Sequence, residues 1–133
     1  MMKLKVEELL DSKGIKYRLI KLSDVAYTVD DVINNSDGTI NPKEICKTII
    51  IVGKKTGKKI ASPEIVKEAS GVEPGAVCPF LLSVPLFIDT EVVDLKTVNC
   101  GSGDHLYGIE FKLKDLISNT DHQITDLSKT IQI

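Results

Sequence analysis

The sequence predicts an α+β fold in which short helices flank a mixed or antiparallel sheet, within a single domain spanning residues 1–133. Three observations predict this fold class. Helical and strand-like patterns alternate in the first half of the chain, and several strand-like segments follow in the second half. Neither repeats nor long linkers divide the sequence. At 133 residues, the chain is long enough to bury a hydrophobic core.

Composition indicates which classes of protein the chain can belong to. A hydrophobic content of 42% and a charged content of 27% are ordinary for a soluble globular protein. The net charge of −2 argues against a protein that coats a nucleic-acid duplex. No apolar run approaches the roughly 18 residues of a membrane-spanning helix. Three cysteines without CxxC spacing and only two histidines predict a reducing, cytoplasmic location and neither a metal nor another cofactor.

In the first half, helices and strands can be placed from capping residues and periodicity. Amphipathic spacing predicts a helix over Lys3–Lys13, which Gly14 ends, and alternation predicts a strand over Ile15–Leu19. Thr28 and Asp31 form the pattern of a capping box that opens a second helix. Asn41 followed by Pro42 predicts a further helix start.

The second half begins with one more helix and continues mainly with strands. Ser62 and Pro63 predict a helix start, and Gly71 predicts its end. Three strands and a short final helix are expected after it, over Val84–Ile88, Thr97–Cys100, Tyr107–Leu113 and Lys114–Ile117. A polar segment follows Ser118 and ends in the apolar Ile131-Gln132-Ile133.

The segment Glu44–Val52 reads as a strand buried on both faces, with Lys47 at its entrance. Burying an unpaired lysine costs several kcal/mol, so two interpretations remain. Lys47 either projects into solvent at the strand end or lies in a cleft that receives an anion or a carbonyl. Six lysines between Lys43 and Lys59, against the single acid Glu44, could likewise bind a few phosphates or merely keep a hairpin soluble.

Two glycine-containing loops could bring backbone amides close to a ligand. Gly75–Pro79 is one, and Gly101–Gly103, followed by Asp104 and His105, is the other. Each pattern alone also fits a plain turn. Cys78 and His105 could form a nucleophile and base, although a buried cysteine beside a proline is the commoner arrangement.

Taken in order, these segments resemble the YbaK/prolyl-tRNA synthetase-associated domain family over about residues 4 to 117. The resemblance rests on seven segments, Tyr27–Thr28, Ile45–Ile50, Ala61–Val66, Val72–Phe80, Val84–Asp89, Val98–Gly103 and Ile109–Phe111. It implies a curved, barrel-like sheet and a trans-editing activity that protects translation fidelity. The expected reaction is hydrolysis of the ester between a wrong amino acid and the terminal adenosine of tRNA.

The resemblance also implies roles for particular residues. Lys47 would position the substrate, and the loop of Gly101, Ser102 and Gly103 would border the ester, with water as the nucleophile and no cofactor. Substrate binding would involve Thr28, Gly75, Ala76, Val77, Cys78, Pro79, Asp104 and His105. Phosphates of the CCA end would meet Lys54, Lys55, Lys58 and Lys59. An aminoacyl-tRNA synthetase is a further expected partner.

The sequence departs from the family pattern in two places. Residues 53–60 are short, which predicts the loss of a strand and a helix and leaves a sheet edge for dimerisation or the lysines to protect. Gly101 and Cys78 stand where serine occurs in relatives. The alternative to a deacylase is therefore a non-catalytic module that binds tRNA or a synthetase.

Overall fold

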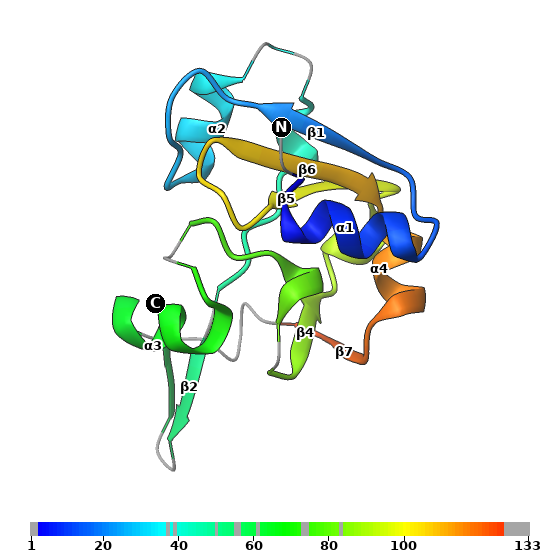
Figure 1. Ribbon diagram of the computed structural model, residues 1–133. Coiled ribbons are helices and arrows are strands. Elements are labelled where there is room, and N and C mark those ends of the chain that lie inside the picture. Colours follow the sequence, from blue (N-terminus) through cyan, green and yellow to red (C-terminus); the bar gives the residue numbers. More distant parts are fainter. Residues whose placement is uncertain are drawn as a thin grey trace.

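The fold was obtained as a computed structural model that describes residues 3–36, 38, 40–49, 51–54, 57–60, 62–72, 75–82 and 84–126 (Figure 1). Its helices are α1 (Lys5–Ser12), α2 (Val29–Asn35), α3 (Pro63–Ser70) and α4 (Leu113–Asn119), with 3-10 turns η1 (Pro42–Glu44), η2 (Pro79–Leu81) and η3 (Val92–Asp94). Its strands are β1 (Tyr17–Lys21), β2 (Ile51–Lys54), β3 (Gly57–Ile60), β4 (Leu86–Asp89), β5 (Thr97–Gly101), β6 (Tyr107–Lys112) and β7 (His122–Thr125).

The strands form three sheets. The largest is antiparallel in the order β1-β6-β5, so the central strand β6 pairs with both neighbours. Strands β2 and β3 form a separate antiparallel hairpin, whereas β4 and β7 form a parallel pair. This mixture confirms the predicted α+β class. Among the described residues, the strands do not close into a barrel.

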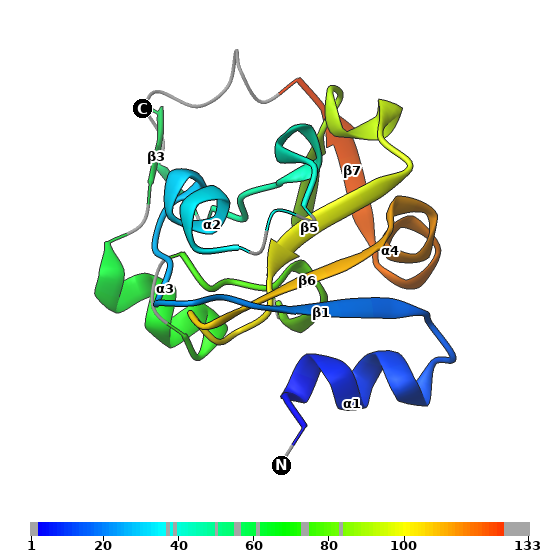
Figure 2. The ribbon, with the colours of Figure 1, turned by 90° about the horizontal axis from the view of Figure 1, so that it is seen from above.

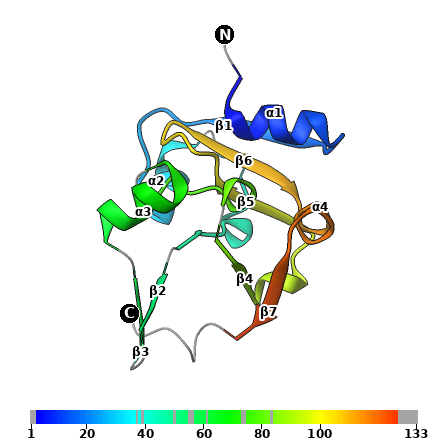
Figure 3. The ribbon, with the colours of Figure 1, turned by 60° about the horizontal axis from the view of Figure 1, so that its bottom comes forward.

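Helices lie at both ends of the largest sheet (Figure 2). Helices α2 and α3 lie near one end, and α4 lies near the other, close to β7. Helix α1 runs alongside the sheet, and the β2–β3 hairpin extends away from it (Figure 3).

Each face of the largest sheet covers its own hydrophobic cluster, because successive side chains of a strand point to opposite faces. The larger cluster joins α1 to one face and contains Val6, Leu10, Ile15, Cys78, Phe80, Ile88, Val98, Cys100, Ile109, Phe111, Leu113 and Leu116. The smaller cluster consists of Ile20, Leu22, Ala26 and Ile40, with Val32 and Ile45 packed against it. Ile20 pairs with Gly108, the neighbour of Ile109 in β6. Because Ile109 belongs to the larger cluster, Ile20 and the smaller cluster lie on the other face of the sheet.

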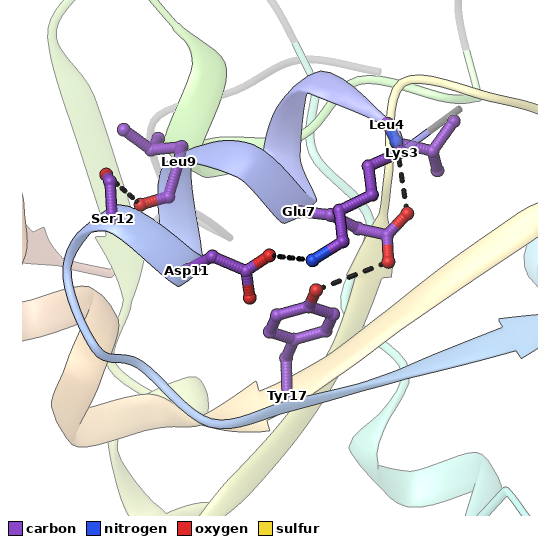
Figure 4. Close-up of polar contacts among 7 residues, drawn as sticks. All are labelled: Lys3, Leu4, Glu7, Leu9, Asp11, Ser12 and Tyr17. Atoms are coloured by element: carbon purple, nitrogen blue, oxygen red, sulfur yellow. Dashed lines mark hydrogen bonds and ion pairs between the residues drawn. The ribbon is translucent and has the colours of Figure 1, made fainter. Parts of the chain in front are cut away.

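Polar contacts attach α1 to β1 (Figure 4). The Tyr17 hydroxyl donates to Glu7 Oε2 at 3.2 Å, and the Leu4 N–H donates to Glu7 Oε1 at 3.0 Å. Glu7 therefore caps its own helix and holds it to the strand. Lys3 and Asp11 form an exposed ion pair beside these contacts.

Several predicted element boundaries are confirmed to within a few residues. Thr28 Oγ1 accepts the Asp31 N–H at 3.1 Å, and the Asp31 carboxylate accepts the Thr28 N–H at 3.3 Å, as in a capping box. Ser62 caps α3, and Gly71 ends it in the left-handed conformation with φ of +78°. Asn41 caps only a 3-10 turn, because the chain becomes extended at Ile45.

Two predictions about the sheet were wrong. The segment 44–52 is not one strand buried on both faces, since β2 starts at Ile51 and Ile49 is 39% exposed. Residues 57–60 form β3, so the short connection does contain a strand. The polar segment after Ser118 contains β7, for which the sequence analysis placed no element. This strand pairs in parallel with β4, and two of its four side chains are exposed.

Candidate functional site

A narrow pocket opens on the side of the sheet that carries the smaller cluster. Its walls come from the turn before α2, the segment 45–48, the loop at 75–77, strand β5, the turn at 104–105 and the start of β6. Seven of the predicted site residues line it: Thr28, Lys47, Gly75, Val77, Gly101, Asp104 and His105. The cavity volume is about 40 Å³, room for only a few water molecules. A larger ligand must therefore part the walls.

Lys47 lies in this pocket lining with an exposed side chain. Its segment is tied to β5 because Ile45 forms a parallel bridge with Asn99 and the Cys46 N–H donates to Asn99 O at 2.8 Å. Among the described residues, no carboxylate pairs with the Lys47 ammonium. The lysine thus combines both interpretations of the sequence: it is solvated, and it stands at a pocket.

Two glycines allow the walls to come together. A Cβ on Gly75 would lie 2.6 Å from Tyr27 O, and a Cβ on Gly101 would lie 2.5 Å from Val77 O. Both distances are shorter than real Cβ contacts, so only glycine permits these backbones to meet. Gly75 additionally has a φ of +96°. The predicted loops are therefore in direct contact, which the sequence could not show.

The remaining residues of these loops support the walls from behind. Ala76, Cys78 and Pro79 are buried and do not line the pocket. The buried Ser102 hydroxyl donates to Tyr107 O at 2.7 Å and accepts the Asp104 N–H at 3.2 Å. The Gly103 N–H donates to Ala76 O at 2.7 Å. Ser102 and the Gly103 amide are thus engaged within the protein, so the loop presents Gly101 to the pocket.

Tyr27, His105 and Asp104 bring aromatic and acidic groups to the pocket wall. The Tyr27 ring is 51% exposed, and its centroid lies 4.5 Å from that of His105. The Ala26 N–H donates to His105 O at 2.9 Å, which ties the turn before α2 to the turn after β5. The Asp104 carboxylate accepts the Leu106 N–H at 2.8 Å. Tyr27 is a pocket residue that the site prediction missed, although it precedes Thr28.

The cysteines do not form the suggested nucleophile and base. Cys78 is 2% exposed within the larger cluster, and burial raises the pKa of its thiol to about 12. His105 lines the pocket, whereas Cys78 does not. A hydrogen bond from the Cys100 thiol lowers the pKa of Cys46, and the same bond, together with burial, raises the pKa of Cys100. Both of these cysteines border the pocket.

Asn99 is a second pocket residue that the prediction missed. It is 2% exposed, and its Nδ2 is the one buried side-chain N or O atom without a hydrogen-bond partner among the described residues. Leaving an amide donor unpaired in the interior costs about 1–3 kcal/mol. The available signal was a polar residue between the apolar Val98 and Cys100 in a predicted strand. Alternation would place such a residue on a solvated face, but segment 45–46 covers this one.

The predicted phosphate-binding lysines lie on the β2–β3 hairpin. Lys54 belongs to β2, and Lys58 and Lys59 belong to β3, where they pair in register with Gly53 and Val52. Lys55 falls outside the described residues. The hairpin follows the Lys47 segment along the chain and projects from the body of the molecule (Figure 3).

Within the described residues, no three histidine, cysteine or acidic side chains gather as metal ligands would. None of the helices in the same part of the chain has the length and apolar character needed to span a bilayer.

Comparisons with known proteins agree with this fold. The chain superposes on the crystal structure of hypothetical protein APE2540 with a TM-score of 0.79 and 23% identity, covering 92% of this chain and 97% of that one. It also superposes on a proposed trans-editing enzyme for prolyl-tRNA synthetase, with a TM-score of 0.71, 19% identity and coverages of 91% and 92%. A scaffold protein for computational grafting of linear epitopes superposes with a TM-score of 0.70 and 16% identity, covering 91% of this chain and 92% of that one.

Sequence comparison identifies the family. No curated protein sequence matches this chain significantly. The profile described as "Aminoacyl-tRNA editing domain", in contrast, matches residues 32–118, which include Lys47 and both glycine-containing loops. The chain therefore belongs to the aminoacyl-tRNA editing domain family.

Proposed function

We propose that the protein is a cytoplasmic aminoacyl-tRNA deacylase that edits mischarged tRNA in trans. The observation that carries this proposal is the convergence of Lys47, Gly75 and Gly101 from three distant segments on one pocket. Family membership supports editing in general. The described structure supports the specific reaction because Lys47 offers a cation and the Gly101 backbone can approach a ligand closely. Cys78 is buried, so it does not offer an alternative nucleophile.

The reaction is the hydrolysis of an ester. Water adds to the carbonyl carbon, the bond to the ribose oxygen breaks, and that oxygen receives a proton while the amino acid leaves. Negative charge develops on the carbonyl oxygen, and a preorganised cation or N–H donor stabilises it. Lys47 supplies the cation in this proposal, and the Gly101 segment borders the ester. The terminal adenosine would lie against the exposed Tyr27 ring, since aromatic rings bind unstacked bases.

The hairpin lysines extend the site toward the tRNA. Lys54, Lys55, Lys58 and Lys59 would contact phosphates of the single-stranded CCA end, for which a few charges suffice. The net charge of −2 is compatible with such a local contact. A synthetase or a second copy of the chain is a further proposed partner, since the hairpin's strand edges are unpaired among the described residues.

A panel of mischarged tRNAs tests the proposal. Each is incubated with the protein, and release of the amino acid is compared with the uncatalysed rate. The proposal expects accelerated hydrolysis of at least one member. Binding of tRNA ends without acceleration of any member would contradict it and would establish the non-catalytic module instead.

A further inference from the structure

Asn99 combines complete burial with an unused hydrogen-bond donor. Its side chain is 2% exposed, and Nδ2 has no partner among the described residues. Ser102 is the other buried polar residue in the described part of the chain, and its hydroxyl is fully used by neighbouring backbone groups. Because unpaired buried donors are rare in folded proteins, the amide of Asn99 requires an explanation.

The surrounding backbone fixes where this amide lies. Asn99 pairs with Glu110 across β6 and bridges Ile45 on its other side, so it occupies the middle of three adjacent chain segments. Gly108 leaves space for it, since a Cβ there would lie 3.1 Å from Asn99 Oδ1. Neighbours Val98 and Cys100 point into the larger cluster. Asn99 therefore points to the opposite face, which carries the pocket.

Asn99 also lies next to the two groups assigned to the substrate. Gly101 follows two residues later in β5, roughly 7 Å along the strand and on the same face. Lys47 follows two residues after Ile45, whose bridge partner is Asn99. All three residues line the pocket. Because the Ile45–Asn99 bridge is parallel, the chain runs from it in the same direction to Lys47 and to Gly101. An ester held by these two residues would thus have its carbonyl oxygen next to the Asn99 amide.

We infer that Asn99 is a catalytic residue whose Nδ2 donates a hydrogen bond to the carbonyl oxygen of the aminoacyl ester. This inference rests on the proposed deacylase function. A neutral amide donor needs no proton to be removed or added, and side-chain amides are established stabilisers of developing oxyanions. Nδ2 is closed to solvent, so the ester engages it only when substrate parts the walls. Binding would then satisfy a donor that folding leaves unpaired.

Two variants separate this role from a structural one. Asn99→Ala removes the unpaired donor, so its melting temperature should equal or exceed that of the wild type. Ser102→Ala removes a hydroxyl that is fully bonded, so its melting temperature should fall. The single-turnover deacylation rate of Asn99→Ala should fall about 100-fold on whichever mischarged tRNA the wild type hydrolyses, as for loss of one oxyanion donor.

The outcomes distinguish this inference from the proposed function. An unchanged rate in Asn99→Ala would overturn the inference, and so would a slower rate accompanied by a lower melting temperature like that of Ser102→Ala. If the wild type hydrolyses no panel member, the proposed function fails. Binding of a 3′-aminoacylamino-adenosine then tests whether Asn99 contacts the aminoacyl group. Weaker binding to Asn99→Ala than to wild type would support the contact, and equal or undetectable binding to both would overturn it.

Discussion

The backbone N–H of Cys46 donates a hydrogen bond of 2.8 Å to the carbonyl oxygen of Asn99. Through this bond and the adjacent Ile45–Asn99 bridge, the lysine segment becomes a fourth, short neighbour of the β1-β6-β5 sheet. Lys47 is therefore positioned by the edge of β5 and not by a strand of its own. This relationship explains how an exposed lysine can have a defined place beside the glycine-containing loops.

Gly75→Ala should destabilise the protein more than Gly71→Ala. Both glycines have positive φ, +96° and +78°, but a Cβ at Gly75 would meet Tyr27 O at 2.6 Å, whereas nothing lies within 4 Å of one at Gly71. Overpacking of this kind costs about 1–3 kcal/mol beyond the shared backbone strain. Urea unfolding of both variants measures the difference. Equal losses would show that Gly75 and Tyr27 are not in contact.

Alkylation should modify Cys46 well before Cys78. The lowered pKa of the half-buried Cys46 means that its reactive thiolate forms at a lower pH than in an ordinary cysteine. Burial raises the pKa of Cys78 to about 12, so this thiol stays protonated near neutral pH. Iodoacetamide treatment of the native protein, followed by peptide mass analysis, gives the order. Comparable labelling of Cys78 would argue that the loop is not buried as described.

The free energy of unfolding should fall at high pH, where the Tyr17 hydroxyl ionises. Burial, and then hydrogen bonding to Asp11 and the charge of Glu7, raise its pKa to about 12. Because this folded-state pKa lies above the ordinary value of about 10, the contribution is complete below about pH 10 and is lost as pH rises through about 12. The phenolate absorbance measures the titration, and Tyr17→Phe identifies its signal. A Tyr17 transition near the ordinary value would refute the burial.

Tyr17→Phe itself should lower the free energy of unfolding by about 1 kcal/mol, because it removes the hydroxyl that donates to Glu7. Chemical denaturation at neutral pH measures this loss. Lys16→Ala serves as the control, since Lys16 is exposed and precedes the same strand. A Tyr17→Phe protein as stable as this control would show that the bond between α1 and β1 contributes nothing.

The hairpin lysines should affect binding and not the chemical step. Lys58→Ala with Lys59→Ala should raise KM for mischarged tRNA, leave kcat unchanged and reduce the salt slope of log binding by roughly 1.4, about 0.7 per single-strand phosphate. Lys112→Ala with Lys114→Ala, at the start of α4, is the control. An unchanged salt slope in the hairpin variant would remove these lysines from the tRNA contact.

Local signals in the sequence predicted much of the fold. The capping box of Thr28, the Ser62 cap and the Gly71 stop act within a few residues, so they identify α2 and α3 without any tertiary information. Alternation identified β1 and β6 for the same reason. Strand β7 escaped because it is short, polar and stabilised by pairing with the distant β4. Segment 44–52 was misread because an apolar run does not reveal where pairing begins.

The site was predictable in part. Family resemblance brought Lys47, Gly75 and Gly101 together, but spacing alone could not show that the glycines contact Tyr27 and Val77. Nor could it reveal that Ser102 and Gly103 are used internally, since that depends on the path of the Gly75–Pro79 loop. Asn99 was hidden because its burial depends on segment 45–46, far away in the sequence.

The most direct test of the account is the single-turnover deacylation rate of Lys47→Ala, measured beside Lys43→Ala. Lys43 is an exposed lysine four residues before Lys47 in the sequence, and it does not line the pocket. We expect a loss of about 100-fold in Lys47→Ala, with wild-type melting temperature, and no loss in Lys43→Ala. Equal rates in the two folded variants would contradict the assignment of Lys47 and of the pocket around it.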